Sequence, residues 1–145
     1  MKGPPPRSFK QWDVFMCPFS KERRHPAVVI SNHETCKNGD VEEVNALLCP
    51  SAKVNRPPKP TEEVLDEAGG LDWKTMVRCD NIQLLPKARF DVRKGSVTED
   101  RRNLIARKIV EVLGLPIHRG GRVPRTEPQR PGAGHPGWSF CAVGI

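Results

Sequence analysis

The sequence has 145 residues, of which 28% are charged and 37% hydrophobic, and its formal net charge is +7 at pH 7. A chain of this length is expected to form one domain, and its charge indicates either a polyanionic partner or a solvated basic surface. No apolar run approaches the roughly 20 residues that span a bilayer, and the chain's beginning lacks the apolar centre of a signal peptide. The sequence therefore predicts a cytoplasmic protein without a membrane span.

The cysteines give no sign of a disulfide framework or a metal site. They are Cys17, Cys36, Cys49, Cys79 and Cys141. Their number is odd and no two of them form a C-x-x-C pair, a pattern that favours neither paired disulfides nor zinc ligands. We therefore expect mostly buried free thiols, with no metal and no cofactor.

Three strands are predicted in the first third of the chain, after an extended leader at residues 1–10 that contains three consecutive prolines. β-branched and aromatic residues favour strands, and a proline is tolerated where a strand opens. The strands are expected in WDVFMCPF (12–19), PAVVISN (26–32) and VEEVNALLC (41–49). A basic loop at residues 20–25 joins the first two, and Asn38-Gly39 predicts a turn before the third.

The next segments are less distinct. TEEVLDEAGG (61–70) suits a helical turn as well as a strand, because it is acidic and contains no aromatic residue. KTMVRCDNIQLLP (74–86) predicts one or two strands that end at its proline.

The clearest element is a helix within SVTEDRRNLIARKIVEVLGLP (96–116). Ser96 or Thr98 can cap its beginning, and Gly114 followed by a proline predicts its end. Its apolar residues recur at helical spacing and are expected to pack on the strands. They are Leu104, Ile105, Ile109, Val112 and Leu113. Residues 118–145 show no periodicity and predict an irregular, disordered tail, which leaves residues 11–117 as the folded domain.

A basic cluster stands before the second strand. Arg23, Arg24 and His25 lie directly against Pro26 and the apolar run that follows it. Such a cluster is found either as a solvated loop or as a site for a phosphate group, because arginine's planar fork of donors matches phosphate oxygens. The residues alone leave both interpretations open.

Several segments, in this order along the chain, resemble the MazF/PemK toxins of bacterial toxin–antitoxin systems. The resemblance implies a mainly β fold, a small SH3-like (CcdB/PemK-like) barrel with a C-terminal α-helix. It also implies that EEVL (62–65) is a strand. The segments are DVFMCPF (13–19), HPAVVIS (25–31), NALLCPSAK (45–53), GLDWKTMVRCDNIQLLPKARF (70–90) and KGSVTEDRRNLIARKIVEVLGL (94–115).

The resemblance further implies a toxin endoribonuclease that cleaves single-stranded RNA without metal, through attack of a 2′-hydroxyl on the adjacent phosphate. Where the family has its catalytic arginine, this chain has His25, with Arg24 one place earlier. Pro50 stands where the family usually has a threonine, beside Ser51. Arg24, His25 and Ser51 are therefore the expected catalytic residues, since histidine can transfer protons near neutral pH. The alternative is a barrel that has lost catalysis and only binds RNA or an antitoxin.

Five further residues are predicted to contact RNA, although each also has a plain structural interpretation. Trp12 or Phe19 can stack on a base or pack in the core. Gln83 can line the RNA groove or the seam of a dimer, or have an ordinary structural role. The five residues are Arg23, Trp12, Phe19, Lys53 and Gln83.

Asp13 is expected to orient His25 or Arg24 by a charged hydrogen bond, or else to cap a turn.

The partners implied by the resemblance are single-stranded RNA, a cognate antitoxin and a second copy in a homodimer. A related branch of this fold acts on gyrase through a C-terminal Trp-Gly-Ile, whereas this sequence ends in Val143-Gly144-Ile145.

Overall fold

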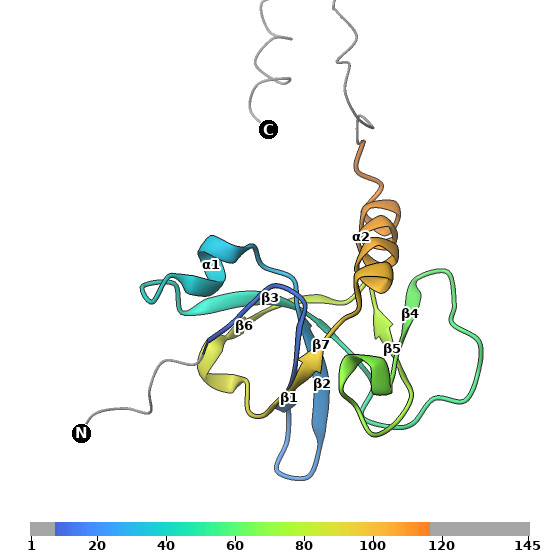
Figure 1. Ribbon diagram of the computed structural model, residues 1–145, viewed down its shortest axis with the longest axis horizontal. Helices are drawn as coiled ribbons and strands as arrows, with labels where there is room; N and C mark the ends of the chain where they lie inside the picture. Colours follow the sequence, from blue (N-terminus) through green and yellow to red (C-terminus); the bar gives the residue numbers. More distant parts are fainter. Residues whose placement is uncertain (1–7, 117–145) are drawn as a thin grey trace, which may run out of the picture. The chain divides into compact units, whose positions relative to one another are not determined.

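The computed structural model describes residues 8–116, which form seven β-strands, two α-helices and two 3-10 helices (Figure 1). The predicted tail at residues 118–145 and most of the predicted leader lie outside the described residues. Phe9, within that leader, is buried in the core. In chain order the elements are β1 (Asp13–Pro18), β2 (Arg24–Val29), α1 (His33–Lys37), β3 (Glu43–Leu48), β4 (Glu62–Leu65), η1 (Glu67–Gly69), β5 (Thr75–Arg78), β6 (Ile82–Pro86), η2 (Lys87–Arg89), β7 (Arg93–Ser96) and α2 (Glu99–Leu113).

The strands form two antiparallel sheets. One has five strands in the order β6-β3-β2-β1-β7, and the other is the β4–β5 hairpin, which lies beside it next to α2 (Figure 1). The mainly β fold with a C-terminal helix is thus confirmed, with its strands divided between two sheets. The segment EEVL is a strand, as the resemblance implied. β2 and β3 lie inside the larger sheet, so each has a strand on both sides.

Both faces of the five-stranded sheet carry a hydrophobic cluster, because successive side chains of a strand point to opposite faces. In β1, Phe15 belongs to one cluster, where its ring lies 5.0 Å from that of Phe9 and 5.5 Å from that of Phe90. Its neighbour Val14 belongs to the other cluster, which is completed by β4, β5 and Ile105 of α2. Because both faces of these strands are buried, the strands could be predicted from the sequence as short apolar runs.

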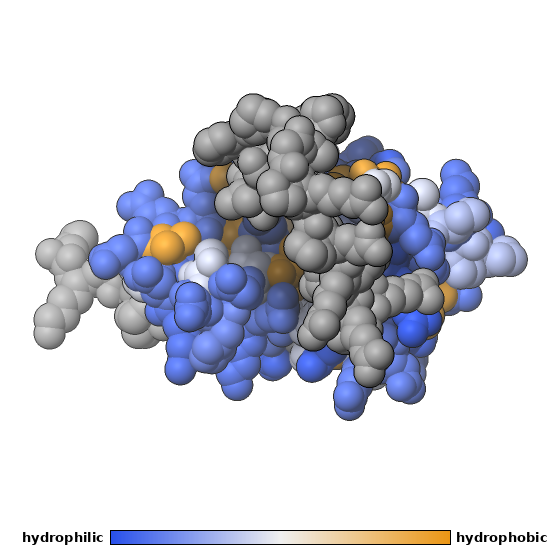
Figure 2. All heavy atoms as spheres, turned by 90° about the horizontal axis from the view of Figure 1, so that it is seen from above, coloured by the Kyte–Doolittle hydropathy of each residue, from blue (hydrophilic) through white to orange (hydrophobic). Residues whose placement is uncertain are grey.

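Helix α2 begins after Thr98 and ends at Gly114, whose backbone is left-handed, as the sequence predicted. Its packing is less complete than expected. Ile105 is fully buried, but Leu104 is 42% and Leu113 51% exposed, because the helix extends past β4 and away from the sheets (Figure 1). The face of the molecule in Figure 2 is mainly hydrophilic, with hydrophobic residues in separate small patches.

Helix α1 was not predicted, because five residues are too few to show a helical period. Its first turn is capped by the side chain of Asn32, which accepts a hydrogen bond from the Thr35 amide at 2.9 Å. Its last turn is capped from a distant element. The ammonium group of Lys87 donates to the carbonyl oxygens of Thr35, Cys36 and Asn38 at 3.0, 3.2 and 2.9 Å. This long-range cap ties α1 to the end of β6.

Cys17, Cys36, Cys49 and Cys79 are buried free thiols, as predicted, and Cys141 lies outside the described residues. Burial raises the pKa of the Cys17 thiol to about 12 and that of Cys79 to about 11, so both are neutral at physiological pH. No helix within residues 8–116 has the length and apolarity needed to cross a membrane.

A close backbone contact between η1 and β7 gives the first testable prediction. Gly70 has a φ of +94°, and a Cβ atom there would overlap the Lys94 carbonyl group. We therefore expect Gly70→Ala to lower the free energy of unfolding by about 2 kcal/mol or more, from strain and steric overlap together. Gly39→Ala is the control, since a Cβ there has no atom within 4 Å. Urea denaturation of both variants measures the effect, and equal midpoints would contradict the prediction.

Candidate functional site

The side chain of His25 joins the ends of β2 and β3. Its Nδ1 lies 2.9 Å from the carbonyl oxygen of Cys49, and the Cys49 amide donates to the carbonyl oxygen of Pro26, also at 2.9 Å. A carbonyl can only accept, so Nδ1 carries the proton in this contact. In the neutral ring Nε2 is then the atom with a free lone pair, and it can accept a proton from another molecule.

An aromatic ring and a cation lie beside His25. The Phe19 ring meets the imidazole edge to face with 5.1 Å between centroids, and the guanidinium carbon of Arg89 lies 5.4 Å from the centroid of the Phe19 ring. Phe19 follows β1 and begins the turn to β2, which is closed by the hydrogen bond from the Phe19 amide to the carbonyl oxygen of Arg23. Arg89 was not among the predicted site residues, because it is far from His25 in the chain, although it belongs to the segment 70–90 that resembles the family.

Arg24 does not share this arrangement. Arg24 and His25 already belong to β2 rather than to the preceding loop, so their side chains point to opposite faces of the strand. The Arg24 guanidinium forms an ion pair with the Asp91 carboxylate at 2.8 Å, with 61% of the arginine side chain exposed. Arg23 is exposed at the tip of the hairpin. Of the three predicted cations, His25 alone contacts the end of β3.

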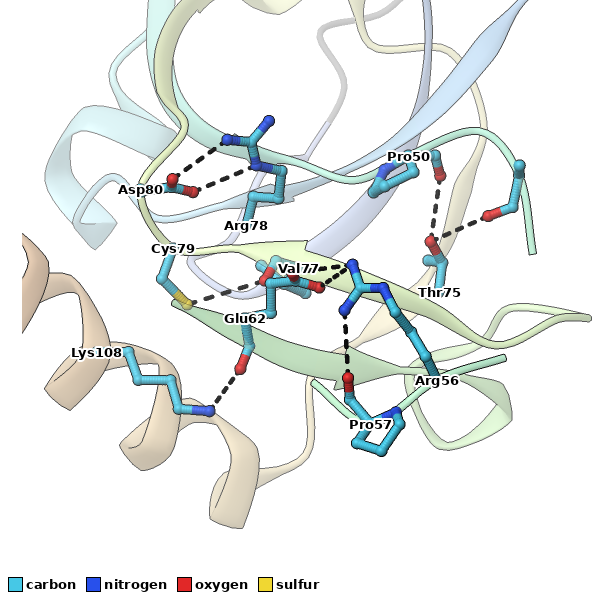
Figure 3. A network of polar contacts seen from close by, with 11 residues as sticks. Pro50, Arg56, Pro57, Glu62, Thr75, Val77, Arg78, Cys79, Asp80 and Lys108 are labelled. Atoms are coloured by element: carbon cyan, nitrogen blue, oxygen red, sulfur yellow. Dashed lines mark hydrogen bonds and ion pairs between the residues drawn. The ribbon is translucent and has the colours of Figure 1, made fainter. Parts of the chain in front are cut away.

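Ser51 is exposed two residues after Cys49, in a loop whose course is fixed by a buried threonine. The hydroxyl of Thr75 on β5 lies 3.3 Å from the carbonyl oxygens of both Pro50 and Ala52 (Figure 3). Two residues further along, the Val54 amide donates to the Lys74 carbonyl oxygen at 3.0 Å. Residues 50–54 therefore run from the His25 contact along the beginning of β5. The contacts of Thr75 were not predicted, because they join segments that are more than 20 residues apart in the chain.

Asp13 and Trp12 lie at the opposite end of β1 from His25. His25 pairs with Cys17, which is four residues from Asp13, or roughly 13 Å along the strand. The Asp13 carboxylate accepts hydrogen bonds from the Arg93 guanidinium at 3.1 Å and from the Lys10 amide at 3.0 Å. Of the two roles expected for it, Asp13 therefore has the turn-capping one. Trp12 packs against the core with a φ of +75°, a strained conformation for this residue. Of the two roles expected for it, Trp12 therefore has the core-packing one, at the end of β1 away from the basic hairpin.

Gln83 and Lys53 belong to other segments of the chain than His25. Gln83 is on the edge strand β6, opposite Ala46, and its side chain donates to Asn81 at 3.1 Å. Lys53 is exposed and lines a pocket of about 490 Å³ that also contains Trp73. Within residues 8–116, no three His, Cys, Asp or Glu side chains are grouped so that they could hold a metal ion.

A half-buried ion pair at the same pocket joins Asp66, after β4, to Arg101 of α2. The Asp66 carboxylate accepts two hydrogen bonds from the Arg101 guanidinium, at 2.7 and 3.1 Å. It also accepts one from the Ala68 amide at 3.1 Å. The hydrogen bonds from Arg101 lower the pKa of Asp66 below its ordinary value, and Asp66 in turn raises the pKa of Arg101.

Comparison with known proteins identifies the family. A family model described as the PemK-like, MazF-like toxin of type II toxin–antitoxin systems matches residues 10–113. The chain belongs to this family. A search of curated proteins found no match.

Solved structures show the same MazF-like fold. An endoribonuclease from a Mycobacterial species superposes with a TM-score of 0.63 and 23% identity, covering 77% of this chain and 97% of that one. An endoribonuclease from a Mycobacterial species in complex with its cognate antitoxin gives 0.61 and 23%, covering 76% and 99%. A MazE-MazF complex from Deinococcus radiodurans gives 0.59 and 20%, covering 76% and 99%. At these identities the superpositions establish the fold.

The loop of this MazF-like chain provides a test of the Thr75 contact. Thr75→Val keeps the side-chain volume but leaves two carbonyl groups without their shared donor. We expect the free energy of unfolding to fall by about 1–2 kcal/mol and the Val54 amide to exchange its hydrogen faster. Thr61→Val is the control, because Thr61 accepts the hydrogen bond of the Cys79 amide with its backbone carbonyl oxygen, which the substitution keeps. Unchanged exchange in Thr75→Val would contradict the assignment.

The Asp66–Arg101 pair predicts a pH-dependent contribution to stability. Since the pKa of Asp66 is lower in the folded chain than in the unfolded chain, the pair stabilises the fold above about pH 4 and ceases to do so as pH falls through the folded value. Asp66→Asn keeps an acceptor for the Ala68 amide but removes the charge. Its free energy of unfolding should lie below that of the wild type near neutral pH and converge with it in acid. A difference that stays constant with pH would contradict this.

Proposed function

We propose that this protein is a toxin endoribonuclease that cleaves single-stranded RNA at the joined ends of β2 and β3. The observation that carries the proposal is the contact of His25 Nδ1 with the Cys49 carbonyl oxygen, which leaves Nε2 as the proton acceptor. Membership of a toxin family supports it, as does the fold shared with enzymes named endoribonucleases.

In the proposed reaction, His25 Nε2 removes the proton from a ribose 2′-hydroxyl, whose oxygen attacks the adjacent phosphorus. The bond from phosphorus to the 5′ oxygen breaks, and this oxygen takes a proton from solvent. The products are a 2′,3′-cyclic phosphate and a free 5′-hydroxyl. The nucleophile belongs to the RNA itself, so the reaction needs no metal-bound water.

Two neighbours of His25 are suited to the charge that develops on the phosphate. Ser51 lies on the loop that follows Cys49 and can donate a hydrogen bond to a phosphate oxygen. Arg89, over the Phe19 ring, supplies a fixed positive charge near the imidazole. We assign Arg24 and Arg23 to binding the RNA strand beyond this centre, because Arg24 lies on the other face of β2 and must leave Asp91 to bind a phosphate.

The family also suggests partners for this site. We propose that a cognate antitoxin covers the basic hairpin with an acidic segment that folds on binding, and that the protein works in the cytoplasm as a homodimer. The fold is shared with an endoribonuclease solved in complex with its cognate antitoxin and with a MazE-MazF complex.

A second candidate is a protein that binds RNA or the antitoxin without cutting RNA. Pro50 favours it, because proline offers neither a hydroxyl group nor an amide donor to a phosphate. Loss of one transition-state donor lowers a rate by about a hundredfold or more. The engagement of Arg24 by Asp91 points the same way.

Two variants of His25 separate its chemical role from its structural one. In His25→Asn the amide nitrogen occupies the position of Nδ1 and can still donate to the Cys49 carbonyl group, but no group replaces Nε2. We expect this variant to keep its stability. Its rate of cleavage of single-stranded RNA should fall by about a hundredfold or more. His25→Ala should lose both stability and cleavage, whereas His33→Ala, on the exposed face of α1, should lose neither.

The products and the cofactor requirement complete this test. Cleavage should yield cyclic phosphate ends, should stop when the attacking 2′-hydroxyl is removed, and should continue in the presence of a metal chelator. Wild-type cleavage undiminished in His25→Asn would refute the assigned base. RNA binding without cutting, together with cutting by a His25→Arg, Pro50→Thr double variant, would establish the second candidate instead.

A further inference from the structure

The ion pair between Arg24 and Asp91 crosses strand β1 beside the proposed site. On one side of β1 lies β2, in which Arg24 pairs with Pro18. On the other side Asp91 leads into β7, and its amide donates to the carbonyl oxygen of Met16 at 2.8 Å. Neighbouring strands are about 4.8 Å apart, so the two side chains together span the width of β1. They meet at 2.8 Å.

The backbone of Asp91 is fixed, whereas the ion pair itself is open to solvent. Phe90, directly before it, is fully buried. Directly after it, the carbonyl oxygen of Val92 accepts a hydrogen bond from the Met16 amide at 2.9 Å. The Arg24 side chain is 61% exposed and that of Asp91 33%. The carboxylate is therefore held in place opposite a guanidinium that a molecule in solution can reach.

Arg24 borders the two chain ends that form the proposed site. It directly precedes His25 in β2. Where β2 and β3 end, the Cys49 amide donates to the carbonyl oxygen of Pro26. Arg24 is two residues before Pro26 in the sequence, and Ser51 is two residues after Cys49. An RNA strand that runs along these ends can therefore bring a phosphate to Arg24.

The segment 89–91 places opposite charges on the first two residues of β2. The Arg89 guanidinium lies over the Phe19 ring, which contacts His25. The Asp91 carboxylate binds Arg24. A guanidinium binds a carboxylate and a phosphate with the same planar fork of donors, so Asp91 and an RNA phosphate compete for Arg24.

We propose that Asp91 is an autoinhibitory residue, which occupies Arg24 in the free protein and must be displaced by a phosphate when RNA binds. The inference rests on the proposed ribonuclease function and adds a control on the affinity for RNA. Exposed ion pairs are weak, so the displacement should lower this affinity by about fivefold at most.

The test measures equilibrium binding of a short single-stranded RNA in which 2′-O-methyl groups prevent cleavage. Asp91→Asn keeps the size of the side chain and removes its charge. We expect this variant to bind the RNA about two- to fivefold more tightly than the wild type. Its affinity should also fall more steeply with salt, because no displaced carboxylate takes up a cation. With cleavable RNA, KM should fall by the same factor and kcat should stay unchanged.

Two controls separate this effect from the general attraction of RNA to a less acidic protein. Asp40→Asn removes the same charge from an exposed turn and should leave binding nearly unchanged. Arg24→Gln removes the other partner of the ion pair. Asp91→Asn should have no effect on binding when it is combined with Arg24→Gln, since both changes act on one contact. Circular dichroism establishes that each variant is folded, and Asp91→Ser replaces Asp91→Asn if the latter does not fold.

The outcomes separate this inference from the function on which it rests. Tighter binding that requires Arg24 would support autoinhibition, as would binding of RNA by Asp91→Asn but not by the wild type. A wild type that binds and cuts RNA would leave the function standing. Autoinhibition alone would then be refuted by equal affinities of wild type and Asp91→Asn, or by tightening that persists in Arg24→Gln. Absence of RNA binding in both proteins would refute both proposals.

Discussion

The arrangement around the site depends on a missing backbone donor. At the end of the β2–β3 ladder the Cys49 amide bonds to the carbonyl oxygen of Pro26, and the return bond from residue 26 to the Cys49 carbonyl oxygen cannot form, because proline has no N–H. The imidazole of His25 supplies the donor instead. The Cys49 carbonyl group, which belongs to a buried residue, is thereby satisfied. One side chain completes the ladder and is fixed in position by doing so.

Single polar side chains also hold the smaller elements to the sheets. A domain of this size has a limited core, and several segments are attached by single charged side chains that reach across the chain. Lys87 caps α1, Arg101 holds Asp66, and Lys108 of α2 binds the carbonyl oxygen of Glu62 on β4 (Figure 3). These contacts fix where loops run. The loop that carries Ser51 is held in a similar way, by the hydroxyl of Thr75. The position of the candidate site is therefore set in part by residues outside it.

The sequence was sufficient for elements whose residues repeat with a period and insufficient for contacts between distant segments. The strands around Phe15 and Val28 and the helix around Ile105 were predicted because burial imposes a local pattern. The partnership of Asp13 with Arg93 spans 80 residues and has no local pattern. The same holds for Arg89 beside Phe19. At the site, the pairing of the two strand ends could be anticipated from the resemblance, but the hydrogen bond that His25 makes could not.

The two departures from the family pattern are better understood together than separately. An arginine before the proline would bring a permanent charge, whereas the imidazole brings a proton acceptor and a donor in one ring, and its donor is already used by the Cys49 carbonyl group. Arg24 does not compensate, because strand alternation directs its guanidinium to Asp91. In the reaction that we propose, the positive charge that the phosphate requires would then come from another element. Arg89, reached through the Phe19 ring, is the cation whose position relative to His25 is fixed by a ring contact. In the proposed site, a histidine base and an arginine on η2 take the place of an arginine at position 25 and a hydroxyl at position 50.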